Sequence, residues 1–532
     1  MSQQISIERN VSLSKSILWK LQRDYYAQKG IDAWTGSVPF YITSNVYIAE
    51  VYARVVVRFV QDLVRCGKYD SSEPVYVMEL GTGSGQFSYY CMRKIFTLQE
   101  ELGVEANICY VMTDFAESNI KFWEQHPKFQ KYLANQQLDF AIYDLEESET
   151  LQLLHSGKIL GSSPTKNPLC AFANYIFDTV RHDIFHADDN EVEEVLVRLK
   201  TDESNIQDGK PVELTGLKTS FKYREIEDDN YYDDKICNDI LDFYAKNLKK
   251  STTFLMPVGA FHCIRTLGKI SNNNLMIIST DKGYSDLKTL DGLGDPHIAF
   301  HGSFSMSVNF HAIAEYIKRI GGEANLQSVR EGIKTGVFYL GNKLDELAET
   351  KCAIADWVNG VGPGDFFHYH RLFREHDNIF NLKNFLSHMQ LSKWDPYVFS
   401  LFSSKISEQI SNENSAIKEG FIFGIKNILV DKIYQMPGVD DHFFNAAMVM
   451  HTLHQYKEAA DYYKQSTACA KKDFAVLYNM GLCYHAAGDL EAALEIFKEA
   501  MSQKDSSEKT ADWITQIEKE IADGKTAKDS KK

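Results

Sequence analysis

The chain contains the stretch Val75-Tyr76-Val77-Met78-Glu79-Leu80-Gly81-Thr82-Gly83-Ser84-Gly85-Gln86-Phe87, in which an apolar run ends in an acid and three glycines follow at alternate positions. The apolar run predicts a buried strand, and the pattern after the last glycine predicts a helix. Glycines suit the turn between them, because a side chain would hold the backbone away from a ligand or forbid positive φ. Open α/β sheets bind small molecules in the crevice where such a strand ends.

The spacing of the glycines indicates which ligand the turn would suit. A dinucleotide site needs G-x-G-x-x-G, but Gln86 and Ser88 stand where the third glycine would be required. The pattern E-x-G-x-G-x-G instead resembles the first motif of the class I S-adenosylmethionine-dependent methyltransferases. An acid beside the turn suits the sulfonium and ammonium of that cofactor. We therefore expect the cofactor to contact Glu79, Gly81, Thr82, Gly83 and Gly85; the alternative is a glycine turn in an α/β protein that binds no cofactor.

Length and composition narrow the protein class. A chain of 532 residues predicts two to four domains, and its 44% hydrophobic and 24% charged residues are ordinary for globular protein. The net charge of −16 argues against a general affinity for nucleic acid or anionic membranes. The nine cysteines form no C-x-x-C pair or zinc-type cluster, so we expect reduced thiols and no metal site. With no signal layout and no apolar run of membrane-spanning length, we expect a cytoplasmic protein.

Acids follow the next two predicted strands. Asp114 ends the strand predicted over 108–114, where a carboxylate can accept hydrogen bonds from ribose hydroxyls. The alternative is that Asp114 caps the helix starting near Glu117. Asp144 ends the strand predicted over 138–144 and could accept from the adenine amino group, although acids often follow strands as turn formers.

The fourth strand, predicted over 168–178, brings two polar residues to the same edge of the sheet. Asn174 and Asp178 should lie beside the glycine turn, where a methyl acceptor must approach. We expect Asp178 to act as a base if the acceptor carries a proton, and Asn174 to orient the acceptor or the cofactor.

The rest of the first 345 residues follows an α/β pattern. Residues 1–70 are expected to form a helical cap, with helices over 17–26 and 46–64. The loop between them, 33–44, either connects the helices or closes over the cofactor with groups such as Thr43. The methyltransferase domain is expected over 71–345, with an acidic insertion over about 185–250 that carries a β-hairpin. Its acidic runs are a solvated face or a docking face for a basic protein segment.

Five segments extend the resemblance to the MidA family, the mitochondrial complex I assembly methyltransferases and their bacterial relatives. They are residues 41–44 with 49–53, the glycine turn 79–85, and the segments 173–178, 281–283 and 305–310. The resemblance implies a Rossmann-like class I methyltransferase fold with a cap and an inserted hairpin, and arginine methylation of a partner protein. This chain departs from the family at Thr82, Ser84, Tyr175, Lys282 and Ser307. Tyr175 replaces a glutamate that would clamp a guanidinium, which leaves Asp178 as the nearest replacement.

The carboxyl part is predicted to be all-α. Residues 346–438 read as a helical linker region. A 34-residue repeat over 439–523, with small residues where two helices meet, resembles the tetratricopeptide repeat and ends in a capping helix. It either binds a peptide or braces the catalytic domain. The lysine-rich tail, 524–532, is expected to be disordered.

Two functional hypotheses follow from the sequence. The first is a methyltransferase that uses S-adenosylmethionine to modify a protein side chain, with arginine as one candidate and the repeats holding the partner. The second is a catalytically degenerate methyltransferase fold that works as an assembly or scaffold protein through its repeats. The oligomeric state is left open.

Overall fold

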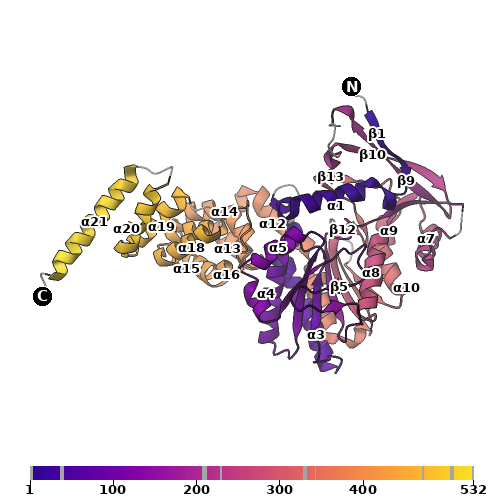
Figure 1. The fold of residues 1–532 in the computed structure, drawn as a ribbon, viewed down its shortest axis with the longest axis horizontal. Coiled ribbons are helices and arrows are strands. Elements are labelled where there is room, and N and C mark those ends of the chain that lie inside the picture. Colours follow the sequence, from indigo (N-terminus) through magenta and orange to yellow (C-terminus); the bar gives the residue numbers. More distant parts are fainter. Residues whose placement is uncertain are drawn as a thin grey trace. The chain divides into compact units, whose positions relative to one another are not determined.

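The computed structural model describes residues 4–35, 41–205, 212–227, 230–327, 332–341, 343–469, 473–503 and 508–529. The chain divides into two compact units, Met1–His368 and Tyr369–Lys532. The first unit is an α/β structure and the second is helical throughout its described residues, as Figure 1 shows. The expected α/β class with a helical carboxyl-terminal region is thus confirmed.

The centre of the first unit is a twisted sheet whose main path follows the order β16–β17–β12–β7–β2–β3–β4. In chain order these strands are β2 (Val75–Glu79), β3 (Ile108–Asp114), β4 (Leu138–Ile142), β7 (Leu169–Asn174), β12 (Leu275–Tyr284), β16 (Glu323–Leu326) and β17 (Ile333–Leu340). The five strands from β12 to β4 are parallel, and β17 runs antiparallel to both of its neighbours. Short β15 (Val308–Asn309) pairs with β12 off this path.

The strand order reverses between β2 and β7. From β2 the chain proceeds outward to β3 and β4, then returns to β7 on the other side of β2. A crevice forms at such a reversal, outside the carboxyl ends of the strands, and ligands bind there. The glycine turn follows β2 directly, so the sheet topology places it at this crevice.

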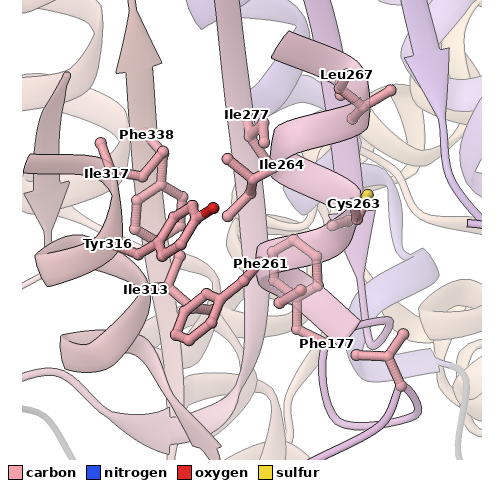
Figure 2. Packing of buried hydrophobic residues seen from close by; sticks show 14 of the residues in the cluster. Phe177, Phe261, Cys263, Ile264, Leu267, Ile277, Ile313, Tyr316, Ile317 and Phe338 are labelled. Carbon is pink, nitrogen blue, oxygen red and sulfur yellow. The ribbon is translucent and has the colours of Figure 1, made fainter. Parts of the chain in front are cut away.

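Helices cover both faces of the sheet (Figure 1). On one face lie α3 (Val46–Arg65) and α4 (Gln86–Glu101). The centre of the Phe172 ring of β7 is 5.1 Å from that of Tyr52 in α3 and 5.9 Å from that of Phe87 in α4. On the other face lie α8 (Val258–Ile270) and α10 (Phe310–Arg319), whose Phe261 and Tyr316 rings stack at 4.5 Å. Figure 2 shows this second layer, with Ile277 of β12 and Phe338 of β17 facing it.

A second, antiparallel sheet accompanies the central one. Its order is β1–β9–β8–β11, and β10 also pairs with β9. The strands are β1 (Gln4–Val11), β8 (Asp183–Asp188), β9 (Glu191–Asp202), β10 (Leu217–Glu225) and β11 (Thr252–Met256). The predicted hairpin is therefore present as β9 and β10, but it belongs to a five-stranded sheet. The expected amino-terminal cap also contains the strand β1, which was not predicted because β1 pairs with β9 almost two hundred residues later and no local pattern shows that partner.

The remaining elements of the first unit are short connections and surface helices. The helices are α1 (Ile17–Lys29), α2 (Tyr41–Ser44), α5 (Glu117–Gln125), α6 (Gln130–Ala134), α7 (Lys235–Asn247), α9 (Leu287–Leu290) and α11 (Ala348–Ala353), with a π-helical segment at Ile354–Gly360. The 3-10 turns are Leu13–Lys15, Gly30–Thr35, Glu203–Asn205, Leu214–Gly216 and Leu344–Glu346. Two-stranded ribbons pair β5 (Leu151–Gln152) with β6 (Ile159–Leu160) and β13 (Ala299–His301) with β14 (Ser303–Ser305).

The second unit begins later than the sequence suggests. Residues just after 346 belong to the first unit because α11 packs on α3, where Asp62 accepts hydrogen bonds from the Thr350 amide and hydroxyl, both at 2.8 Å. Helix α12 (Pro363–Glu375) spans the boundary between the units. It is followed by α13 (Leu382–Leu391), α14 (Pro396–Gln409), α15 (Ser415–Gly424), α16 (Val430–Lys432), 3-10 turns at Asp377–Ile379 and Ile410–Asn412, and a π-helical segment at Ile425–Leu429.

The predicted repeat appears as two consecutive helix pairs. They are α17 (His442–Thr452) with α18 (Tyr456–Cys469) and α19 (Phe474–Ala486) with α20 (Leu490–Met501). A Cβ on Gly481 would lie 2.9 Å from the Phe497 ring, so the small residue is required where α19 meets α20. Helix α21 (Glu508–Asp529) follows. It continues to Asp529, into the tail that was expected to be disordered.

Candidate active site

The glycine turn has the backbone conformation that its sequence predicts. Gly81, Gly83 and Gly85 have φ angles of 58°, 60° and 80°, which other residues adopt only under strain. The turn is also tightly covered. A Cβ on Gly83 would lie 2.7 Å from the Trp34 ring, and one on Gly81 would collide with Ile176. Trp34 belongs to the loop that the sequence analysis considered as a cover for the site, and the structure places it against this turn.

Glu79 lies directly before the turn and is only 4% exposed. Its Oε2 accepts hydrogen bonds from the Ser88 hydroxyl and, at 2.7 Å, from the Tyr110 hydroxyl. Burial raises the pKa of Glu79 to about 8, and the two hydroxyl donors offset this only in part. Both of these donors are on Oε2 and no hydrogen bond to Oε1 occurs within the described ranges, so one oxygen remains for a ligand.

Thr82 and Asp114 hold the turn against β3. The Thr82 amide donates to the Thr113 carbonyl at 2.8 Å. Asp114 accepts from the amides of Gly83 and Ala116, both at 3.0 Å, and from Asn119 at 2.9 Å. Burial nevertheless raises the pKa of Asp114. The alternative role for Asp114 was to cap a helix starting near Glu117. That helix, α5, does begin at Glu117, but its cap residue is Ala116, and Asp114 accepts a hydrogen bond from the Ala116 amide.

Asp144 follows β4 and is held by the cap. Arg23 of α1 forms a salt bridge with its Oδ2, and the Glu146 amide donates to Oδ1 at 3.0 Å. Burial raises the pKa of Asp144, but the hydrogen bond and charge of Arg23 outweigh it, so the pKa stays below its ordinary value. Arg23 also lies over the Phe115 ring, 5.4 Å from its centroid. The carboxylate predicted to bind adenine is thus already paired with a cation.

Asn174 ends β7 and is oriented by buried hydroxyls. Its Oδ1 accepts from the Tyr52 hydroxyl at 2.6 Å, and that hydroxyl is 2.6 Å from the Thr280 hydroxyl. Thr280 in turn lies 2.9 Å from the Thr335 hydroxyl. Asn174 Nδ2 is buried and has no hydrogen-bond partner among the residues that the structure describes.

Asp178 and Asp281 form a buried carboxyl pair. Asp178 is 3% exposed, its amide donates to Asp281 Oδ2 at 3.1 Å, and the two carboxyls interact electrostatically. Burial raises the pKa of Asp178 to about 7, and burial with the charge of Asp178 raises the pKa of Asp281 well above its ordinary value. Asp178 Oδ1 has no partner in the described part of the chain. Tyr175, three residues earlier, has a φ of 50°, a strained conformation that clusters at functional sites.

Two adjoining cavities connect these residues. The Asp178 cavity, about 780 Å³ including space open to solvent, is also lined by Glu79, Thr82, Phe87 and Lys282. The Asp144 cavity, about 830 Å³, is also lined by Arg23, Asp114, Phe115 and Leu145. The two share six lining residues: Tyr26, Trp34, Gly81, Asn174, Tyr175 and Thr179.

The sequence-predicted residues therefore converge with one exception. Seven of them (Glu79, Gly81, Thr82, Asp114, Asp144, Asn174 and Asp178) line the cavities, and Gly83 and Gly85 complete the turn. The side chain of Thr43 lies outside the described part of the structure. No group of three or more metal-binding side chains occurs in the described ranges, and none of the helices described there is long and apolar enough to cross a membrane.

The site residues predicted from the sequence did not include Arg23, Tyr52 and Asp281. Arg23 lies about sixty residues before the glycine turn, and Tyr52 sits within an ordinary apolar helix pattern. Asp281 carried a usable signal, because it is an acid near the end of a predicted strand, like Glu79 and Asp114. The other two gave none, since only the packing of the cap and α3 brings them to the sheet edge.

Comparison with known proteins finds no matching family model and no matching curated protein. Among solved structures, an uncharacterized COG1565 superfamily protein from Burkholderia thailandensis is 14% identical, with a TM-score of 0.38 over 63% of this chain and 90% of that one. A second COG1565 superfamily member from the same organism, solved with bound S-adenosyl-homocysteine, is 14% identical, with a TM-score of 0.34 over 62% and 96%. An O-methyltransferase family protein, also from this organism, is 8% identical, with a TM-score of 0.23 over 60% and 69%. These scores are below 0.5, so the assignment of function rests on the geometry of the site.

Proposed function

We propose that this protein is an S-adenosylmethionine-dependent methyltransferase. The observation that carries the proposal is the glycine turn at the strand-order reversal, flanked by acids at the ends of β2, β3 and β4 and opening into two adjoining cavities. The cofactor offers an ammonium, ribose hydroxyls and an adenine in a row. Glu79, Asp114 and Asp144 lie in the same order across three neighbouring strands.

The chemistry of the cavities supports this alignment. Phe115, Leu145 and Ile176 give the Asp144 cavity apolar walls suited to an adenine ring. Asp114 already accepts three hydrogen bonds, so we assign it at most one ribose hydroxyl. Arg23 lowers the pKa of Asp144, whose carboxylate can accept from an amino group. The orphaned Asn174 donor and the free Glu79 oxygen lie in the Asp178 cavity, where the methionine end would reach.

The bound cofactor would supply an electrophilic methyl group on a sulfonium. The chain's own contribution is then to position the two reactants in a water-poor cleft. Positioning of this kind can account for a large part of the rate enhancement of a methyl transfer. Asp178, with a pKa near 7 and an unpartnered oxygen, is suited to take a proton from the methyl acceptor at neutral pH.

The methyl acceptor can be narrowed further by the chemistry of the cavity. We propose a protein side chain, with arginine as the first candidate, because the Asp178 carboxyl that lines the cavity suits a guanidinium. The helix pairs of the second unit resemble tetratricopeptide repeats, and we propose that they hold the partner protein.

Calorimetric titration with S-adenosylmethionine tests the proposal. We expect micromolar binding by the native chain and at least a hundredfold loss in Gly83→Val, whose side chain would meet Trp34. The matched control is Gly103→Val. Gly103 has nearly the same φ, 59°, but no atom within 4 Å of a Cβ, so it imposes the strain without the obstruction. Absence of binding by the folded native protein would refute the methyltransferase assignment and favour a scaffold role.

A further inference from the structure

Asn174 stands at the junction of the two cavities with a fixed orientation. It lines both, and its Oδ1 is occupied by the Tyr52 hydroxyl at 2.6 Å. The opposite amide atom, Nδ2, is buried without a hydrogen-bond partner in the described ranges. A buried unsatisfied donor is energetically costly. Asn174 thus presents a donor, and a ligand that satisfies it must carry an acceptor.

The orientation of Asn174 is imposed from α3. Tyr52 is fully buried, and its ring is enclosed by Phe87 at 5.5 Å and Phe172 at 5.1 Å. With its single proton directed to Asn174, the Tyr52 oxygen accepts from Thr280, which lies 2.6 Å away. The hydroxyl of Thr335, 2.9 Å from that of Thr280, extends this line into β17. The Tyr52 hydroxyl therefore has its position set by packing and by a second hydrogen bond.

Glu79 presents the opposite chemistry to the same cavity. Ser88 and Tyr110 both donate to Oε2, which leaves Oε1 without a partner in the described chain and able to accept once a cation favours the ionised carboxylate. Glu79 pairs with Phe172 in the parallel register of β2 and β7, and Asn174 lies two residues beyond Phe172. An acceptor and a donor on adjacent strands thus line one cavity. An α-amino acid carries an ammonium and a carboxylate on a single carbon and would satisfy both.

We infer that Glu79 and Asn174 form a clamp for an α-amino acid zwitterion, and that Tyr52 is the positioning residue that keeps the Asn174 amide turned toward its carboxylate. The inference rests on the proposed function, since it identifies the zwitterion with the amino acid end of the cofactor. In addition, the site would select its ligand by the carboxylate. This selection would depend on Tyr52 of α3, which does not itself line either cavity.

Two ligands and one variant separate this role from a structural one. S-adenosylhomocysteine carries the carboxylate, whereas its decarboxylated analogue, 5′-(3-aminopropylthio)-5′-deoxyadenosine, keeps the amine and lacks it. We expect Tyr52→Phe, which keeps the ring and removes the hydroxyl, to weaken S-adenosylhomocysteine binding about tenfold in calorimetry. The same variant should bind the analogue within about threefold of the native protein. Asn174→Ala should show the same selectivity, and it gives the same test if Tyr52→Phe does not fold.

Tyr244→Phe is the matched control, because it removes another fully buried tyrosine hydroxyl, 2.9 Å from His311 Nδ1, that lines neither cavity. It should leave both affinities unchanged. Equal weakening of both ligands by Tyr52→Phe, or no weakening of either, would overturn the clamp while leaving the proposed function in place. Failure of the native protein to bind S-adenosylhomocysteine would instead refute the proposed function, and the clamp with it.

Discussion

At the scale of single residues, Glu79 is a buried acid whose ionisation is disfavoured. The sheet and α4 enclose it, and two hydroxyls hydrogen-bond one of its oxygens, yet burial still raises its pKa to about 8. The folded protein therefore holds a proton on this carboxyl at neutral pH that the unfolded chain has released. A cationic ligand would recover the cost of ionising it. Such a destabilising acid is expected at a binding site and is not needed for the fold.

Glu79→Gln should make the protein more stable at alkaline pH. The pKa of Glu79 is raised in the folded state, so native stability falls as pH rises from about 4.5 toward 8, whereas glutamine does not titrate. We expect the variant's unfolding free energy to gain on the native value by roughly 1–3 kcal/mol between pH 5 and pH 8. Urea titrations at several pH values measure this, and a gap independent of pH would contradict it. The variant should also lose S-adenosylhomocysteine affinity.

At the scale of elements, helix α1 acts on the site through one side chain. Arg23 crosses from the cap to Asp144 after β4, and its guanidinium also lies over Phe115. The contact is partly buried, so it is worth more than the exposed ion pair between Lys20 and Asp24 on the same helix. The cap is thereby attached to the cavity wall where the adenine is proposed to bind.

Arg23→Ala should loosen this attachment. We expect S-adenosylhomocysteine binding to weaken about three- to tenfold, because Asp144 loses the cation that orients it. Hydrogen exchange in Ile17–Lys29 should become faster. Lys20→Ala, which removes an exposed pair on the same helix, is the control and should change neither measurement. An unchanged affinity in Arg23→Ala would show that the cap contact is independent of ligand binding.

At the scale of the whole molecule, the chain separates into an α/β unit and a unit that is helical throughout its described residues. The residues lining both cavities fall before position 369, within the first unit. The second unit is built from helix pairs in which small residues allow close approach, as Gly481 does beneath the Phe497 ring. Local changes in the second unit should therefore leave the cofactor site intact.

Gly481→Val tests this separation. The added side chain would press on Phe497 and should destabilise the α19–α20 pair by about 1–3 kcal/mol, the usual cost of overpacking. Hydrogen exchange should rise in Phe474–Ala486 and Leu490–Met501, while S-adenosylhomocysteine affinity stays within twofold. Ala486→Val, at the exposed end of α19, is the control. Loss of ligand binding in Gly481→Val would show that the two units are energetically coupled.

The sequence alone was sufficient for the local elements of the sheet and its glycine turn. Apolar runs ending in acids located β2, β3, β4, β7 and β12, and the glycine spacing predicted the positive φ angles. These signals are local, because strand periodicity and backbone sterics act between near neighbours. They also sufficed to bring Glu79, Asp114, Asn174 and Asp178 to one edge, since parallel strands share a carboxyl end.

What depends on tertiary structure is the set of partners that each of these residues receives. The pairing of β1 with β9, the Arg23–Asp144 bridge and the Asp178–Asp281 pair all join positions about one hundred residues or more apart. The same holds for the hydroxyl of Tyr52 that turns Asn174 toward the cavity. No periodicity encodes such contacts, because they arise from the packing of whole helices on the sheet. Protonation and orientation, on which the chemistry depends, are therefore properties of the folded chain.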